Sequence, residues 1–267
     1  MRIGVFDSGF GGLTVLRALL ERIPGAEYIY LGDTARLPYG AKSRETVARY
    51  ATSSARYLVD QGAEYLVVAC NTASALALDA MRDAVAVPVL GVVETGANAA
   101  DAHSASRDVL VIATAATMES HAYARACAER RMRALEKACP LLVPLVEEGW
   151  IEHPVTAEVL RIYMSELLAE ARAGELQPDT LVLGCTHYPL LRTQIERAVP
   201  ASLRVIDSAD VTAEQVARTL GGRMGEKLGG RPEARFFATD SVPKFRALGS
   251  RFLGRPIECV ELVDLGG

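Results

Sequence analysis

Short hydrophobic runs rich in Val, Ile and Leu recur along the chain, and stretches of helix length separate them. Most of these runs are continuous and do not alternate with polar residues, which is the pattern of parallel strands covered on both faces. We therefore expect strands at Ile3–Phe6, Tyr28–Leu31, Tyr65–Ala69, Val89–Val93, Val109–Ala113, Leu181–Gly184, Arg204–Ile206, Arg235–Ala238 and Ile257–Glu261.

Helical spacing fills the intervals between these runs. Apolar residues recur at helical steps early in the chain, at Leu13, Leu16, Leu20 and Ile23. Pro24 and Gly25 then end the pattern. The same spacing returns near the other end, at Phe245, Leu248 and Phe252, before Gly254. Repeated strand–helix units of this kind predict an α/β fold.

Two places interrupt the alternation and suggest boundaries. One follows Glu94, at the start of a small, polar segment. The other covers residues 207–232, where five glycines fall between Gly221 and Gly230. The tail beyond it holds too few elements for a domain of its own, so we expect it to complete one of two halves.

A weak internal sequence similarity also indicates two halves. The segment Leu66–Thr72 resembles Leu181–His187, since each is an apolar strand that ends in a small residue and is followed by cysteine. Ligands of open α/β sheets bind beyond the carboxyl ends of the strands, where a helix N-terminus also favours a thiolate. Cys70 and Cys185 are therefore candidate functional residues.

Polar residues able to hold a carboxylate or an amino acid follow these cysteines: Asn71, Thr72, Thr186 and His187. Buried apolar filler is the alternative for any cysteine. It is our interpretation of the other three, Cys127, Cys139 and Cys259. Cys185 and His187 lack an accompanying Cys-x-x-Cys or His-x-x-His pattern, so we expect no metal.

Composition narrows the classes of function. The 267 residues carry a formal net charge of −4 without a long basic stripe, so nucleic acid and anionic membranes are not expected partners. No apolar run approaches the ~18 residues of a membrane span. The N-terminus has too little apolar length for a signal peptide, and five widely spaced cysteines form no disulfide framework, so we expect a cytoplasmic protein. The mixed charges at Arg130, Arg131, Arg133 and Lys137 are interpreted as a solvated helix face.

The segment Val5–Gly12 is a strand, an acidic turn and a glycine loop that leads into a helix. It suggests dinucleotide binding, with Asp33 after the next strand as the ribose-binding acid. The match is partial, because Thr14 occupies the third glycine position and no Walker lysine follows. Alternatively, Asp7 and Ser8 project into a cleft while backbone amides approach a small anion, or the segment is a plain turn.

Two further polar segments follow expected strands. Pro38, Tyr39 and Gly40 form a turn that presents an aromatic hydroxyl and free backbone amides, although an ordinary turn has the same composition. Thr114 and Thr117, taken alone, predict a helix cap. The remaining histidines are interpreted as surface residues: His103, His121 and His153.

Together these segments resemble the glutamate racemases of the bacterial cell-wall pathway, within the aspartate/glutamate racemase superfamily. The matching motifs span nearly the whole chain: DSGFGGL at 7–13, DTARLPYGAKS at 33–43, ACNTAS at 69–74, Thr114 with Thr117, PLVE at 144–147, LGCTHYPLL at 183–191, and the tail with Phe236–Asp240, Phe245 and Leu253-Gly254. The two cysteine motifs are specific in combination, whereas the glycine loop alone is weak. Phe10 departs from the aliphatic residue usual in that loop.

The resemblance implies two pseudo-symmetric α/β domains with mainly parallel sheets flanked by helices, and an active site in the cleft between them. It also implies that the C-terminal segment returns to the first domain. We therefore place residues 1–94 and 207–267 in one domain and residues 95–206 in the other. The implied ligand is L- or D-glutamate, with no cofactor and no metal, and a homodimer remains open.

The resemblance further implies racemisation by two bases. One thiolate removes the α-proton, and the opposite thiol delivers a proton to the other face. Cys70 would deprotonate D-glutamate and Cys185 L-glutamate. Asp7 and His187 would assist at their respective cysteines, with Glu147 near His187. The implied substrate-binding residues are Asp7, Ser8, Pro38, Tyr39, Gly40, Cys70, Asn71, Thr72, Thr114, Thr117, Cys185, Thr186 and His187. The D-glutamate formed would serve peptidoglycan synthesis.

Three other interpretations stay open from the residues alone. An aspartate racemase is the nearest rival, although the motifs are closer to the glutamate type. A nucleotide-binding or regulatory module that kept the fold would bind nucleotide and tolerate loss of the cysteines. A redox role would join Cys70 and Cys185 in a reversible disulfide.

Overall fold

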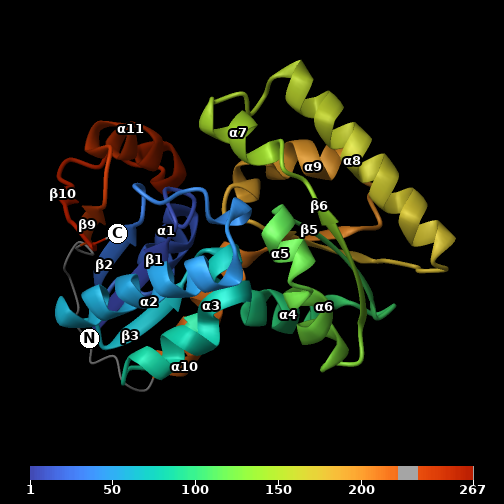
Figure 1. Cartoon of the computed structure of the whole chain (residues 1–267). Coiled ribbons are helices and arrows are strands. Elements are labelled where there is room, and N and C mark those ends of the chain that lie inside the picture. The colour runs from blue at the N-terminus through green and yellow to red at the C-terminus, as the bar shows by residue number, and fades with distance from the viewer. Residues whose placement is uncertain (222–233, 267) are drawn as a thin grey trace.

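Two parallel β-sheets with helices around them form the structure, a computed structural model that describes residues 1–221 and 234–266. The first sheet has the order β10 (Glu261–Leu262), β9 (Ala234–Ala238), β2 (Glu27–Gly32), β1 (Arg2–Asp7), β3 (Tyr65–Val68) and β4 (Val89–Gly91). The second has the order β6 (Arg133–Ala138), β5 (Asp108–Ala113), β7 (Thr180–Gly184) and β8 (Arg204–Asp207). The α/β class is confirmed, and Figure 1 shows the sheets in different lobes.

Helices cover both sheets (Figure 1). Those beside the first sheet are α1 (Leu13–Arg22), the 3-10 turn η1 (Tyr39–Ala41), α2 (Arg44–Asp60), α3 (Asn71–Ala84) and α11 (Val242–Leu253). Those beside the second are α5 (Ala115–Glu119), α6 (Ala122–Ala128), α7 (Leu142–Glu147), α8 (Pro154–Ala173), η2 (Tyr188–Leu191) and α9 (Arg192–Ala198). Two more contact elements from both groups: α4 (Val92–His103) and α10 (Ser208–Leu220).

The C-terminal segment returns to the first sheet. Strand β9 pairs with β2 in parallel, with Phe236 opposite Tyr30, and α11 packs against α1. The last strand is shorter and later than the expected Ile257–Glu261, since it comprises Glu261–Leu262. The first sheet is therefore built from both ends of the chain.

The expected breaks do not coincide with gaps between elements. The position after Glu94 falls inside α4, which is continuous from Val92 to His103. Much of the segment 207–232 is helix α10, which Asp207 caps by accepting hydrogen bonds from two backbone N–H groups. The glycines after Gly221 lie outside the described residues.

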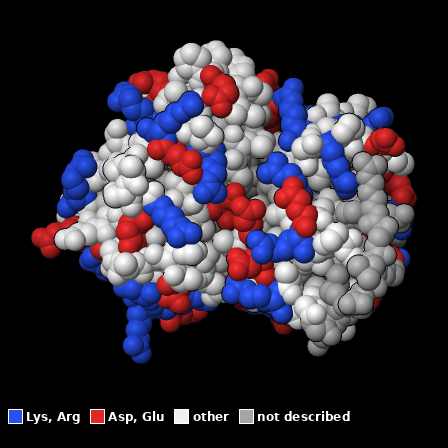
Figure 2. Space-filling model, turned by 180° about the vertical axis from the view of Figure 1, so that it is seen from behind, with Lys and Arg blue, Asp and Glu red and all other residues white. Residues whose placement is uncertain are grey.

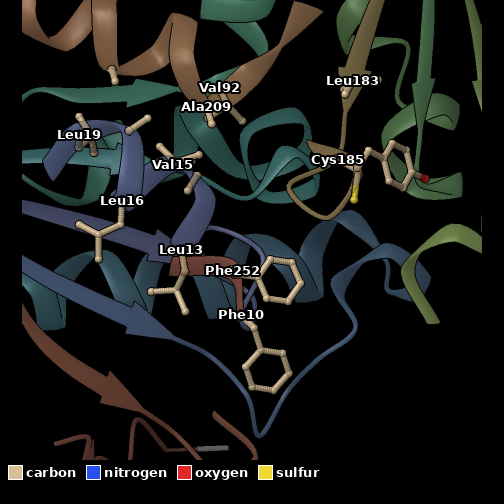
Figure 3. Packing of buried hydrophobic residues seen from close by; sticks show 14 of the residues in the cluster. Phe10, Leu13, Val15, Leu16, Leu19, Val92, Leu183, Cys185, Ala209 and Phe252 are labelled. Carbon is tan, nitrogen blue, oxygen red and sulfur yellow. The ribbon is translucent and has the colours of Figure 1, made fainter. Parts of the chain in front are cut away.

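One hydrophobic cluster extends between the two sheets (Figure 3). Leu13, Leu16 and Leu19 enter it from α1, and all three are fully buried. Val92 of α4 and Leu183 of β7 belong to the same cluster, which also includes Cys185. Apolar packing shared by both parts of the chain therefore holds the two sheets in place around the candidate site.

The two expected helices with clear spacing are confirmed. Helix α1 buries its leucines and ends where Ile23 caps it, just before Pro24. Helix α11 buries Phe245 and Phe252 and ends at Gly254, whose φ of 75° is the left-handed conformation that glycine adopts without a Cβ penalty.

The charged run at 130–137 was wrongly interpreted as a helix face. Residues from Arg133 form β6, an edge strand of the second sheet. Its charges have partners across neighbouring elements: Arg133 binds Asp108 at 2.7 Å, and Lys137 binds Glu170 at 2.8 Å. An edge strand tolerates such charges because its long side chains extend beyond the sheet toward solvent. A run of mixed charges is therefore compatible with an edge strand as well as with a solvated helix face.

The surface carries both signs of charge. Figure 2 shows acidic and basic side chains interspersed over one face of the molecule. In the ranges 1–221 and 234–266, no helix has both the length and the apolar character needed to cross a membrane.

Candidate active site

Cys70 and Cys185 line one cavity of about 330 Å³, although they follow strands of different sheets. Cys70 follows β3 and caps α3, where its Sγ accepts a hydrogen bond from the backbone N–H of Ala73 at 3.4 Å. Cys185 follows β7. Each residue is only 5% exposed. A small ligand in this cavity would lie between side chains that come from both sheets.

Most of the expected site residues line this cavity: Ser8, Pro38, Tyr39, Gly40, Cys70, Asn71, Thr72, Thr114, Glu147, Cys185, Thr186 and His187. Asp7 and Thr117 do not line it. Both are buried behind it and contact residues that do. The structure thus brings the expected residues together from segments far apart in sequence.

The Cys70 side of the cavity carries a buried carboxyl group. Asp7 accepts a hydrogen bond from the backbone N–H of Gly9 at 2.9 Å through Oδ2, while Oδ1 has no partner among the described residues. Burial raises the pKa of Asp7, although the charge of His187 opposes the shift. Burial and then Asp7 raise the pKa of Cys70 to about 12, so this thiol is protonated at neutral pH.

The Cys185 side carries an imidazole and a second carboxylate. His187 Nδ1 lies 4.0 Å from Cys185 Sγ, and His187 Nε2 lies 3.3 Å from Glu147 Oε1. Burial lowers the pKa of His187, but Cys185 and Glu147 outweigh burial and raise it to about 10. Burial acts to raise the pKa of Glu147, yet His187 and Lys244 bring it below its usual value. His187 is therefore an imidazolium at neutral pH, close to the Cys185 sulfur.

The glycine loop serves contact between the two parts of the chain. A Cβ atom on Gly11 would lie 2.2 Å from Thr186 Oγ1, so only glycine fits there. Thr14, at the position that breaks the dinucleotide fingerprint, donates through Oγ1 to the carbonyls of Gly11 and Thr186. The loop therefore lies directly against the segment that carries Cys185.

Hydroxyl and amide groups gather at one wall of the cavity. Thr72 Oγ1 lies 3.1 Å from Thr114 Oγ1 and 3.3 Å from Thr117 Oγ1. Asn71 accepts a hydrogen bond from the Tyr123 hydroxyl at 2.7 Å, which leaves its Nδ2 without a partner among the described residues. The expected helix cap at Thr114 makes no side-chain capping bond. Thr72 and Thr114 line the cavity, so their hydroxyls can exchange these mutual bonds for bonds to a ligand, whereas Thr117 lies behind them.

The turn at Tyr39 differs from the expectation. Its hydroxyl is not presented to the cavity but donates to the buried carboxylate of Asp33. Asp33 also accepts bonds from Arg36 at 2.8 Å and Thr239 at 2.9 Å, and its side chain is completely buried. Asp33 thus has no free face for a ribose, which argues against the nucleotide-binding interpretation. Pro38, Tyr39 and Gly40 of this turn all line the cavity, but the Tyr39 hydroxyl is already bonded to Asp33.

The other histidines and cysteines lie elsewhere. His103, His121 and His153 are exposed, and His121 forms an ion pair with Glu136 at 3.2 Å when protonated. Cys127 and Cys139 are buried, but Cys259 is exposed, so the interpretation as filler is wrong for that residue. In the part of the chain that the structure describes, no three metal-ligating side chains gather, and no lysine lines the cavity.

Sequence reasoning missed the apolar part of the wall. It consists of Phe10, Leu37, Ala41, Ala115, Pro140, Val143 and Pro144. Phe10, Leu37, Ala41 and Pro144 stand inside recognised motifs and could have been found there. The others carry no polar group, so only the fold shows that they meet at the cavity.

Comparisons with known proteins agree with this geometry. A family model described as Asp/Glu/Hydantoin racemase matches residues 3–216. The chain is 53% identical to a glutamate racemase of Koribacter versatilis (strain Ellin345), over 99% of this chain and 98% of the relative. A glutamate racemase of Francisella tularensis, solved in complex with D-glutamate, has a TM-score of 0.88 at 35% identity and covers 99% of this chain and 97% of its own. One from Thermus thermophilus, in complex with beta-chloro-D-alanine, has a TM-score of 0.87 at 44% identity, with the same coverage.

Proposed function

The chain belongs to the Asp/Glu/Hydantoin racemase family, and on this premise we propose that it interconverts L- and D-glutamate with two cysteines and no cofactor. The relatives described above support an isomerase that acts on glutamate. One observation carries the two-cysteine mechanism. Cys70 and Cys185 reach the same cavity from different sheets, and inversion at a carbon atom needs proton transfer on opposite faces.

The two sulfurs have different surroundings, which suit opposite roles in one turnover. His187 Nδ1 lies 4.0 Å from Cys185 Sγ, and the family pattern implies that Cys185 removes the α-proton of L-glutamate. The protonated thiol of Cys70 delivers a proton to the other face. In the reverse direction Cys70 acts as the base, with Asp7 as its assistant. Each turnover leaves the two roles exchanged.

The chain itself supplies the stabilisation that a cofactor would otherwise provide. The α-proton of an amino acid is very weakly acidic, and no lysine among the described lining residues could form a Schiff base. Positioned hydrogen-bond donors must therefore hold the carboxylates and offset the charge that develops at Cα. The free Asn71 Nδ2 and the hydroxyls of Thr72, Thr114 and Thr186 are such donors.

Solvent-deuterium exchange tests this function. The protein is incubated in D₂O with L-glutamate or D-glutamate and no added cofactor, then followed by NMR and circular dichroism. We expect deuterium at Cα together with loss of optical rotation. Cys70→Ser and Cys185→Ser should each lower racemisation at least about 10²-fold without unfolding the protein. Wild-type turnover in either variant would contradict the two-thiol mechanism, and faster turnover of aspartate would favour the rival activity.

Three wider statements belong to the same proposal. The D-glutamate formed supplies peptidoglycan synthesis in the cytoplasm, where two unpaired cysteines stay reduced. We place residues 1–94 and 207–267 in one domain and residues 95–206 in the other. This division assigns the first sheet to one domain and the second sheet, except for Asp207 at the end of β8, to the other. The oligomeric state, for which the resemblance leaves a homodimer open, is tested by sedimentation at several concentrations.

A further inference from the structure

Helix α11 brings a lysine to the hydrogen-bonded chain that ends at Cys185. Lys244 Nζ lies 3.5 Å from Glu147 Oε2, and Glu147 Oε1 lies 3.3 Å from His187 Nε2. His187 Nδ1 in turn lies 4.0 Å from Cys185 Sγ. The two carboxylate oxygens of Glu147 are thus divided between Lys244 and His187, which restricts the rotation of the carboxylate.

Lys244 joins two parts of the molecule that the chain builds separately. It lies on α11, which packs against α1 beside the first sheet, whereas Glu147 ends α7 beside the second. Its Nζ also lies 5.6 Å from the centre of the Phe10 ring. Phe10 and Glu147 both line the cavity, but Lys244 does not. The lysine therefore acts at the edge of the site, without lining it.

We propose that Lys244 is a positioning residue, which holds Glu147 against His187 and so keeps the imidazolium directed at Cys185. The inference rests on the proposed function, in which Cys185 is one of the two bases. Besides Cys185 and Glu147, Asp7 also raises the pKa of His187. The Phe252 ring, also from α11, forms a T-shaped contact with the imidazole, with the ring centres 5.0 Å apart. One helix thus contacts both members of the pair.

A double-mutant cycle separates this role from simple support of the fold. We expect Lys244→Met to lower kcat/KM for glutamate about threefold to tenfold, and Lys244→Arg to restore most of the loss, since arginine keeps the charge. In a Glu147→Gln background, Lys244→Met should cause no further loss. Arg22→Met is the matched control, because Arg22 is exposed on α1 and has no ion pair among the described residues.

Alkylation of the cysteines gives a second measurement that does not depend on the substrate. Iodoacetamide reacts with the thiolate, and mass spectrometry reports Cys70 and Cys185 separately. We expect Lys244→Met to slow alkylation of Cys185 about threefold or more, to leave Cys70 unchanged, and to be reversed in Lys244→Arg.

Two outcomes would overturn the inference. One is an equal loss of kcat/KM from Lys244→Met with and without Glu147, which would place the effect elsewhere. The other is unchanged alkylation of Cys185 in the folded variant. If the wild-type protein does not racemise glutamate, the proposed function fails, and the alkylation rates still decide whether Lys244 acts on Cys185.

Discussion

Asp7 and His187 place groups of opposite charge beside the two cysteines. Burial and then the carboxyl group of Asp7 raise the pKa of Cys70 and so favour its neutral thiol, whereas the His187 imidazolium lies 4.0 Å from Cys185 Sγ. The two thiols are alike in chemistry, so we attribute their different roles at the start of a turnover to these different surroundings.

Substitution of each assistant should therefore affect one direction more than the other. We expect Asp7→Asn and His187→Asn to lower kcat about 10²-fold to 10⁴-fold in one direction and less in the other. The equilibrium constant of a racemisation is one, so kcat/KM must fall equally in both directions and KM must change to compensate. Initial rates from pure L- and D-glutamate measure the four constants. Equal loss of kcat in both directions would argue against separate roles.

At the residue scale, the sequence predicts which side chains carry reactive groups better than it predicts which side chains contact each other. Cys70, Asn71 and His187 carry reactive or polar groups after apolar strands, so their pattern predicts a site. Lys244 offers no such signal, because it is an exposed lysine on a helix and its partner, Glu147, is distant in sequence. The hydroxyl of Tyr39 was assigned to the cavity because the sequence could not show that Asp33 accepts its hydrogen bond.

At the element scale, the turn between β1 and α1 packs so closely against the segment of Cys185 that Gly11 has no room for a side chain. A methyl group on Gly11 would collide with Thr186 Oγ1 and with the His187 ring, whose Nδ1 would lie at 2.6 Å. The collision would involve the segment that carries Cys185, so a side chain at position 11 would displace part of the site.

We therefore expect Gly11→Ala to destabilise the protein by about 1–3 kcal/mol and to lower kcat/KM by more than the loss of folded protein explains. Gly174→Ala is the control, because its Cβ would meet atoms no closer than 3.5 Å at the end of α8. Urea unfolding and initial rates on the same samples measure both effects. Full activity in Gly11→Ala would show that the loop can shift without cost.

Elements with a clear repeat of hydrophobic residues were predictable from the sequence. Elements whose conformation depends on contacts with neighbouring elements were not. The leucine spacing of α1 and the continuous apolar runs of β1 and β7 decide their own conformation. Strand β6 depends on its position at the sheet edge, where Arg133 and Lys137 find acidic partners in distant segments. Helix α4 runs through the expected boundary because a small polar segment can also be helical.

At the scale of the whole molecule, the two sheets share one hydrophobic cluster. Residues of α1, α4 and β7 belong to it, and Val92 and Leu183 are fully buried in it. Separation of the two parts would expose this surface to water, which is unfavourable in proportion to the apolar area.

We therefore expect both parts to unfold in one transition. Trp150, the single tryptophan, lies after α7 and reports on the second part by fluorescence. Amide exchange in β1 and β3 reports on the first. The two midpoints in urea should coincide. An earlier loss of Trp150 signal, with β1 still protected, would show two independent folding units.

The pairing of β9 with β2 has a consequence for how the protein is made. Until the ribosome reaches residue 234, β2 remains an open sheet edge, and such an edge can pair with another chain. At 5–20 residues per second, residues 33–234 take roughly 10–40 s to emerge, so every nascent copy passes through this exposed interval. Lys244 and Phe252 emerge later still. A chain terminated before residue 234 therefore lacks both the strand that pairs with β2 and the helix that carries Lys244 and Phe252, and we expect it to be inactive and prone to association.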